Sequence, residues 1–135
     1  EGVGTGAPGQ GAGRFSLELA LDGSVLIRRS HSAYPATKDR PASIHDDLMV
    51  IYPEGERLRA IYFDNENHVI HYAVSVAAEA RTVTLVSDPS ANAPRFRFVY
   101  KVVDQQTVNG RFEIAPPGKP EAFALYIEGD AKRVR

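Results

Sequence analysis

The side chains that could bind a metal ion or transfer a proton gather in residues 62–72, which read YFDNENHVIHY. Asp64, Glu66 and His68 alternate there, as ligands do in a calcium-binding loop. A loop of that kind needs Gly at its sixth position and Glu at its twelfth, and the chain has Val69 and Ser75 instead. Because Asn and Asp tolerate the backbone of tight turns, we interpret DNEN as a hairpin turn and reject a calcium site.

A second group with metal-ligand chemistry consists of His45 and Asp47, which share one face of a predicted strand, with His71 as a third candidate. Two imidazoles and a carboxylate suit a transition-metal ion or acid–base catalysis. The strand pairing predicted below turns His45 and Asp47 to the outside. We therefore assign no metal, no cofactor and no catalytic residue, and an enzyme that uses this rim stays open as an alternative function.

Residues 4–9, GTGAPG, formally match the G-x-G-x-x-G pattern of dinucleotide-binding loops. They follow no predicted strand, open no helix and contain Pro8. We therefore interpret them as a flexible, glycine-rich lead into the first strand.

Length, charge and cysteine usage exclude several classes of protein. The 135 residues carry 16 basic and 17 acidic side chains, a net charge of -1, so nucleic acid is not an expected partner. The length predicts a single domain spanning residues 1–135. The absence of cysteine excludes disulfides and thiolate metal sites, and it agrees with the cytoplasmic location that we expect. No apolar run reaches the ~20 residues of a membrane-spanning helix, so no membrane span is expected.

The apolar residues alternate with polar ones in short segments separated by turn residues. This pattern predicts an all-β, antiparallel up-and-down meander barrel of about nine to ten strands, and it predicts no helix. The predicted strands are residues 13–21, 25–31, 44–52, 58–64, 68–76, 81–87, 95–103, 107–114 and 122–129.

In a meander, successive turns fall at opposite ends of the barrel. One end then carries the short connections LDGS, PEGE, AAEA and DQQ. The other carries the longer loop 32–43, DNEN, DPSANAP and APPGKPEA, and all four histidines flank this end. A loop-rich end is the usual entrance to an internal site in a small barrel.

In each predicted strand, alternate residues share one face, and the more apolar face is predicted to point inward. Pairing Ile27 with Leu48 would set Arg29 opposite Asp46 on the inward face, with His31 nearer the rim. An ion pair that only fixes the register and an anchor for a charged ligand group both stay open.

Aromatic and aliphatic side chains should cover the rest of the interior. The inward candidates are Phe15, Leu17, Ile27, Leu48, Tyr72, Phe98, Tyr100 and Phe112. Aligning Val102 with Val108 sets Tyr100 opposite Gly110, where the missing side chain leaves room beside the phenol.

Several stretches resemble an uncharacterised bacterial family of lipocalin-like (calycin-type) barrels, distantly similar to nitrobindin and the fatty-acid-binding proteins. The stretches are GAPGQGAGRFSLELALDGSVLIRR, HDDLMVIYPE, LRAIYFDNENHVIHYAVS, APRFRFVY and GRFEIAPPGKPEAF. The resemblance implies a roughly ten-stranded barrel with an interior cavity and no established activity. Members begin with a Gly-x-Trp-x-Gly segment, and this chain has no tryptophan. We therefore expect a truncated first strand and an open seam between the first and last strands.

Two functional features of the related proteins do not carry over. Nitrobindin-type proteins hold haem through a histidine near the carboxyl end, and this chain has no histidine after His71. The Arg-x-Tyr carboxylate clamp of fatty-acid-binding proteins is also missing near the carboxyl end, which reads LYIEGDAKRVR.

The sequence favours a binding protein whose barrel holds a small, largely apolar or weakly acidic molecule below a polar mouth. The predicted ligand-binding residues are Arg29, His31, Asp46, Tyr72 and Tyr100. A filled barrel that acts through its surface stays open as a further alternative. The oligomeric state stays open too, a dimer included.

Overall fold

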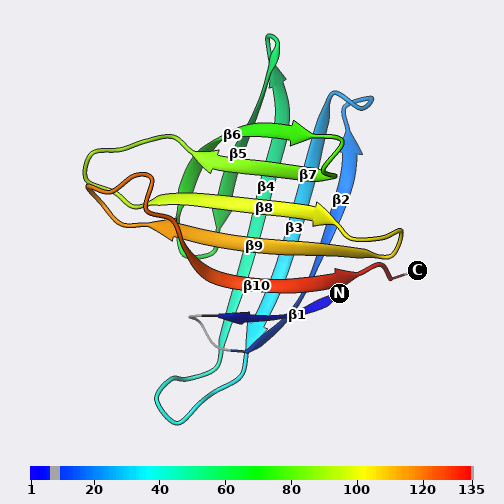
Figure 1. The fold of residues 1–135 in the computed structure, drawn as a ribbon. Coiled ribbons are helices and arrows are strands. Elements are labelled where there is room, and N and C mark those ends of the chain that lie inside the picture. The colour runs from blue at the N-terminus through cyan, green and yellow to red at the C-terminus, as the bar shows by residue number, and fades with distance from the viewer. Residues whose placement is uncertain (7–9, 135) are drawn as a thin grey trace.

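The computed structural model describes residues 1–6 and 10–134, which form ten antiparallel strands and no helix (Figure 1). This confirms the predicted all-β meander barrel. Among the described residues, no helix is long and apolar enough to cross a membrane. The strands are β1 (Gly2–Gly6), β2 (Gly11–Ala20), β3 (Val25–Tyr34), β4 (Ser43–Glu54), β5 (Arg57–Asp64), β6 (Val69–Ala77), β7 (Thr82–Ser87), β8 (Arg95–Val102), β9 (Thr107–Ala115) and β10 (Ala124–Lys132).

The strand β1 closes the barrel between β10 and β2. Its residues pair with β10 from Gly2 to Gly6 and with β2 from Gly2 to Gly4, so the prediction of an open seam is wrong. The interpretation of residues 4–9 as a flexible lead is also wrong for residues 4–6, which belong to β1, while residues 7–9 lie outside the described residues. Glycine permits this close approach, because a Cβ at Gly2 would lie 2.4 Å from the Asp130 carbonyl oxygen.

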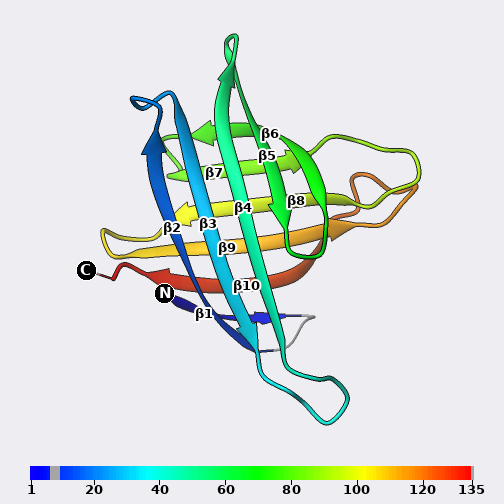
Figure 2. The same ribbon diagram turned by 180° about the vertical axis from the view of Figure 1, so that it is seen from behind.

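The connections alternate between the two ends of the barrel, as predicted. Short turns follow β2, β4, β6 and β8, and both chain termini lie at this end (Figures 1 and 2). The longer loops 35–42, 88–94 and 116–123 lie at the other end with the turn 65–68. DNEN forms the predicted turn, with Asn67 in a left-handed backbone conformation at φ 68°.

The inward faces of β3 and β4 are the opposite of those predicted. Ile27 pairs with Val50 instead of Leu48, which shifts the register by two residues. Arg28 and Met49 lie directly opposite one another, and both are buried. Ile27 and Leu48 alternate with them and therefore face outward. Apolar residues occur on both faces of these two strands, so alternation alone did not identify the inner one.

The other inward candidates agree better with the structure. Phe15, Tyr72, Phe98, Tyr100 and Phe112 all line the interior. The predicted pairing of Tyr100 with Gly110 is confirmed. Leu17 lies on the same face of β2 as Phe15 but is 56% exposed, so it contributes little to the interior.

The packed core lies along β4 to β7, where Met49, Ala60, Tyr62, Tyr72 and Leu85 are buried together. The aromatic rings of β8 pack against this cluster; Phe98, for example, lies 5.8 Å from Tyr72 between ring centroids. The packed side stabilises the barrel through buried apolar area, and the space beside β2, β3 and β10 is free for another role.

The assignment of faces in β4 predicts unequal effects of two neighbouring truncations. Met49→Ala leaves a cavity in the core and should lower the free energy of unfolding by about 2–5 kcal/mol. Leu48→Ala removes a half-exposed outer side chain and should cost about 1 kcal/mol or less. Urea unfolding of both variants provides the comparison. A larger loss for Leu48→Ala would contradict the orientation of β4.

Candidate functional site

A cavity of about 500 Å³ opens at the loop-rich end of the barrel. Its two walls differ in chemistry. Arg28, Ser30 and Ser32 on β3 form a polar wall, and Phe96 and Phe98 lie on β8, across the barrel from β3. The cavity is therefore amphipathic, with polar groups along one side and aromatic rings along the other.

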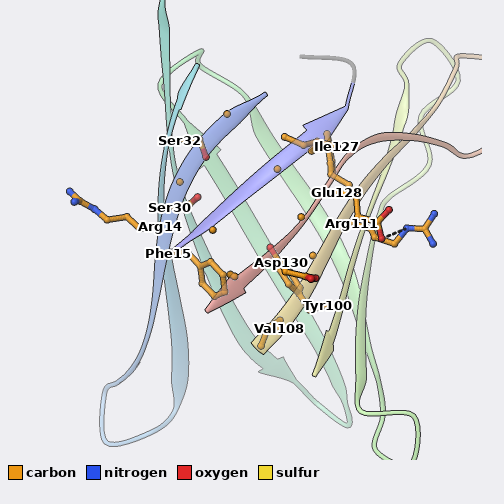
Figure 3. Close-up of a pocket in the computed structure, with 18 of the residues that line it drawn as sticks. Arg14, Phe15, Ser30, Ser32, Tyr100, Val108, Arg111, Ile127, Glu128 and Asp130 are labelled. Carbon is orange, nitrogen blue, oxygen red and sulfur yellow. Dashed lines mark ion pairs between the residues drawn. The ribbon is translucent and has the colours of Figure 1, made fainter. Parts of the chain in front are cut away.

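A second cavity of about 160 Å³ lies beside the first, between β2, β1 and β10 (Figure 3). Arg28, Ser30 and Phe98 line both cavities, so the two spaces are adjacent. Glycines of β1, β2, β9 and β10 form much of its wall. Figure 3 shows Phe15 and Tyr100 beside this space, while Arg14 points away from it. A Cβ at Gly110 would lie 3.5 Å from the Tyr100 ring, an ordinary van der Waals distance, so there is room beside the phenol at this position.

Arg28 and Asp47 form an ion pair between β3 and β4, with Nη1 and Oδ1 2.5 Å apart. Both side chains are about nine-tenths buried. The guanidinium also lies over the rings of Phe15 and Tyr100, at 5.3 and 5.7 Å from their centroids. Ion pairing and cation–π contacts together compensate for the loss of water around a buried charge.

The pKa values of the pair show how burial and charge compete. Burial opposes the charge of Arg28, but the Tyr100 phenol and the Asp47 carboxylate outweigh it and hold the pKa of Arg28 above its usual value. Burial raises the pKa of Asp47, and Arg28 and His45 offset only part of this shift. Arg28 thus stays charged, whereas Asp47 is easier to protonate than an exposed aspartate.

Two buried polar atoms in this region have no hydrogen-bond partner in the described part of the chain. They are Nε of Arg28 and the hydroxyl oxygen of Tyr72. Both groups are hydrogen-bond donors, and both side chains line the larger cavity. Leaving such a donor buried without an acceptor costs about 1–3 kcal/mol, which is the energy that a bound acceptor would recover.

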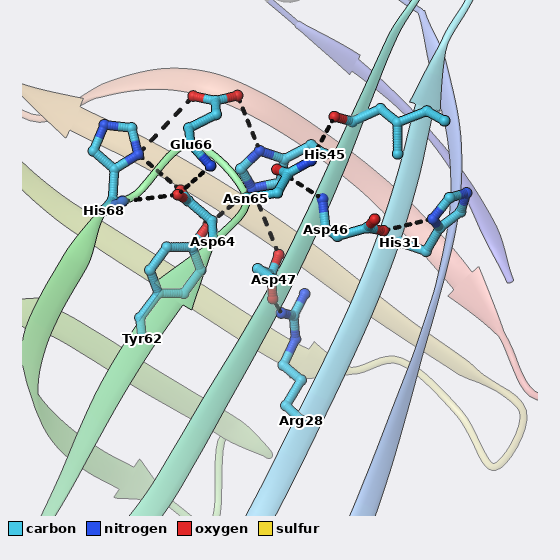
Figure 4. Close-up of polar contacts among 11 residues, drawn as sticks. Arg28, His31, His45, Asp46, Asp47, Tyr62, Asp64, Asn65, Glu66 and His68 are labelled. Carbon is cyan, nitrogen blue, oxygen red and sulfur yellow. Dashed lines mark hydrogen bonds and ion pairs between the residues drawn. The ribbon is translucent and has the colours of Figure 1, made fainter.

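A network of ion-pair contacts and hydrogen bonds continues from Asp47 to the rim (Figure 4). His45 Nε2 lies 3.7 Å from Asp47 Oδ2 and 2.8 Å from the hydroxyl oxygen of Tyr62. The Tyr62 hydroxyl donates to Asp64 Oδ2 over 3.2 Å. Burial, with the nearby charges of Asp47 and Asp64, raises the pKa of Tyr62, so this phenol stays protonated.

Asp64 is the centre of the turn between β5 and β6. Its Oδ1 accepts hydrogen bonds from the backbone N–H groups of Glu66 and His68, at 2.9 and 3.0 Å. Burial would raise the pKa of Asp64, but the hydrogen bonds from the His68 backbone and ring and from Glu66 lower it below its usual value. The carboxylate is therefore ionised and acts only as an acceptor.

Three of the five predicted ligand-binding residues lie outside the cavity. Arg29 and Asp46 are exposed on the outer face, and His31 Nδ1 lies 2.6 Å from Asp46 Oδ1 there. The prediction of an inward Arg29–Asp46 pair is therefore wrong, because these two positions of β3 and β4 lie on the outer face of the barrel. Tyr72 and Tyr100 do line the interior, and their predicted role in ligand binding stays a prediction.

The prediction that His45 and Asp47 face outward is wrong for the same reason. Both line the larger cavity, while His71 is exposed on the outside of β6. Arg28 and Tyr62 were missed altogether. A signal for Arg28 existed in the hairpin 21–24, since pairing across that turn sets Leu17, a predicted inward residue, opposite Arg28.

Comparison with known proteins identifies no family: no protein-family profile and no curated protein matches the chain. The barrel architecture therefore stands on the structure alone.

The unequal environments of two buried tyrosines predict opposite effects of the same substitution. Tyr72→Phe removes an unpartnered hydroxyl and should leave the free energy of unfolding unchanged or slightly raised. Tyr62→Phe removes the contacts to His45 and Asp64 and should lower it by about 1–3 kcal/mol. Urea unfolding at pH 7.5 measures both. Equal losses in the two variants would contradict the proposed network.

The lowered pKa of Asp64 predicts a contribution to stability that depends on pH. The contribution is present above the ordinary aspartate pKa of about 3.9 and is lost as the pH falls through the lower folded value. Asp64→Asn should therefore be less stable than the wild type at pH 7 and should approach it near pH 2, as measured by thermal unfolding across this range. Asp39→Asn, in an exposed loop, is the control. A gap for Asp64→Asn that stays constant with pH would exclude this role.

Proposed function

We propose that the barrel binds one small, largely apolar molecule whose hydrogen-bond acceptor contacts Arg28 and Tyr72. The observation that carries this proposal is the pair of buried, unpartnered donors beside an open cavity. A carbonyl, carboxylate or phenolate oxygen would satisfy them, so the ligand is a neutral acceptor or a weak acid.

The size and lining of the cavity support this class of ligand. About 500 Å³ lies within the range of ~300–1,000 Å³ that is usual for small-molecule sites. Phe96 and Phe112, which both line this cavity, stack with 18° between their ring planes. Buried apolar contact with these rings would supply most of the affinity, and the polar wall would orient the molecule.

Asp47 explains how an acidic molecule could be accepted. Arg28 is already neutralised by Asp47, so an incoming anion would add a net charge to a buried site. Because burial raises the pKa of Asp47, this carboxyl group can take up a proton when an acid binds and so release Arg28 for the ligand.

We also propose that the barrel is lipocalin-like. The closed meander barrel, the entrance at the loop-rich end and the internal cavity support it. The cavities also argue against a filled barrel that acts only through its surface.

Native mass spectrometry of freshly purified protein, with an absorption spectrum of the same sample, tests the proposal. We expect an adduct of a few hundred daltons that disappears on denaturation. If the protein carries no adduct and binds none of a panel of aromatic and aliphatic acids, ketones and phenols, the proposal is wrong.

A double variant tests the role of the ion pair. Arg28→Met combined with Asp47→Leu removes both buried charges together, which avoids leaving either one unpaired. We expect this variant to fold and to bind an acidic ligand about 1.5–3 kcal/mol more weakly, because a charged hydrogen bond is lost. Arg29→Met, on the outer face, should bind as the wild type does. Isothermal titration with one acidic member of the panel measures the affinity of both variants. If the double variant binds it as tightly as the wild type does, the polar contact lies elsewhere.

A further inference from the structure

We propose that the rim of the barrel binds one divalent transition-metal ion of the zinc type, held by His45, Asp64, Glu66 and His68. The site lies on the polar network described above, at the mouth of the larger cavity. None of its four residues is among the proposed ligand contacts, Arg28 and Tyr72.

The donor atoms lie close enough together to share one ion. One ligand atom each from His45, Asp64 and Glu66 lies within 4.8 Å of the others. The turn places Asp64, Glu66 and His68 at alternate positions, and β4 brings His45 beside them (Figure 4). Two imidazoles and two carboxylates are therefore contributed by one strand and the neighbouring turn.

The separations between neighbouring donor atoms are close to the spacing of ligands around one ion. Zinc bonds of about 2.0–2.2 Å to nitrogen and oxygen imply ligand atoms roughly 3.3 Å apart. His45 Nδ1 lies 3.3 Å from Glu66 Oε1. His68 Nδ1 lies 2.8 Å from Asp64 Oδ2 and 3.9 Å from Glu66 Oε2. His45 faces one oxygen of Glu66 and His68 faces the other, so the His68 ring would have to turn toward His45 for all four residues to share one ion.

His45 contacts two of the neighbouring side chains, one with each ring nitrogen. Its Nε2 lies 2.8 Å from the Tyr62 hydroxyl oxygen, and its Nδ1 lies 3.3 Å from Glu66 Oε1. Nδ1 is therefore the nitrogen that can share an ion with Glu66, while Nε2 contacts Tyr62.

The same contacts would orient the ligands. Tyr62 is buried at 5% exposure and joins His45 to Asp64. Metal-binding histidines usually donate their second N–H to a neighbouring acceptor, which fixes the ring and the tautomer. Asp64 is fixed by the two backbone N–H groups of the turn.

The ligand set selects the type of ion. Calcium and magnesium prefer oxygen ligands, and half of these donors are imidazole nitrogens. Mixed nitrogen and oxygen ligands suit zinc and its neighbours in the first transition series. This agrees with the exclusion of a calcium loop from the sequence.

The test is zinc binding by protein that was purified without an affinity tag and dialysed against a chelator. Native mass spectrometry and titration against a competing chelator should give one zinc ion per chain. We expect His45→Gln and Glu66→Gln each to weaken binding at least tenfold. Tyr62→Phe, which removes the orienting hydroxyl, should weaken it about 10–100-fold.

Two other histidines provide matched controls. His31 pairs with Asp46 on the outer face, and His71 is exposed on β6. His31→Gln and His71→Gln should bind zinc as the wild type does. Glu66 is exposed, so Glu66→Gln tests the site with little risk to folding. Absence of stoichiometric zinc, unchanged affinity in Glu66→Gln, or equal losses in the control variants would overturn the proposal.

Discussion

The buried ion pair between Arg28 and Asp47 is the constraint on which the interior depends. A charged pair at this depth is tolerated only with close geometry and further polar contacts. The structure supplies these through His45 on one side and the rings of Phe15 and Tyr100 on the other. The pair fixes the inward faces of β3 and β4, and it separates the packed core along β4–β7 from the open space beside β2 and β10.

The same pair connects the interior with the rim. Asp47 contacts Arg28 through one oxygen and approaches His45 through the other. His45 in turn contacts Tyr62, which donates to Asp64 in the turn after β5. A change of charge in the cavity would therefore reach the rim through four hydrogen-bonded or ion-paired residues. Binding inside the barrel and binding of a cation at its mouth would be thermodynamically linked if both occur, and the linkage would act equally in both directions.

The sequence predicted the architecture and the functional end of the barrel, but not the inner face of two strands. Turn residues such as those of DNEN report directly on local backbone, so the connections could be located. In β3 and β4 the neighbours Leu26 and Ile27, and Leu48 and Met49, give apolar residues on both faces. The choice between faces depends on the pairing with β2 and on the burial of Arg28. The alternation of apolar and polar residues within one strand carries no information about either. β1 was missed because its glycines have low strand propensity, although they permit the close approach that closes the barrel.

The central claim is that Arg28, and not Arg29, points into an open interior with a free Nε–H donor. Nitrogen-15 NMR of the arginine Nε–H groups tests it most directly. The structure predicts a slowly exchanging Arg28 Nε–H signal with nuclear Overhauser contacts to the rings of Phe15 and Tyr100. The Arg29 signal should exchange rapidly with solvent and show no such contacts. The reverse pattern, with a protected Arg29 and a rapidly exchanging Arg28, would contradict the account.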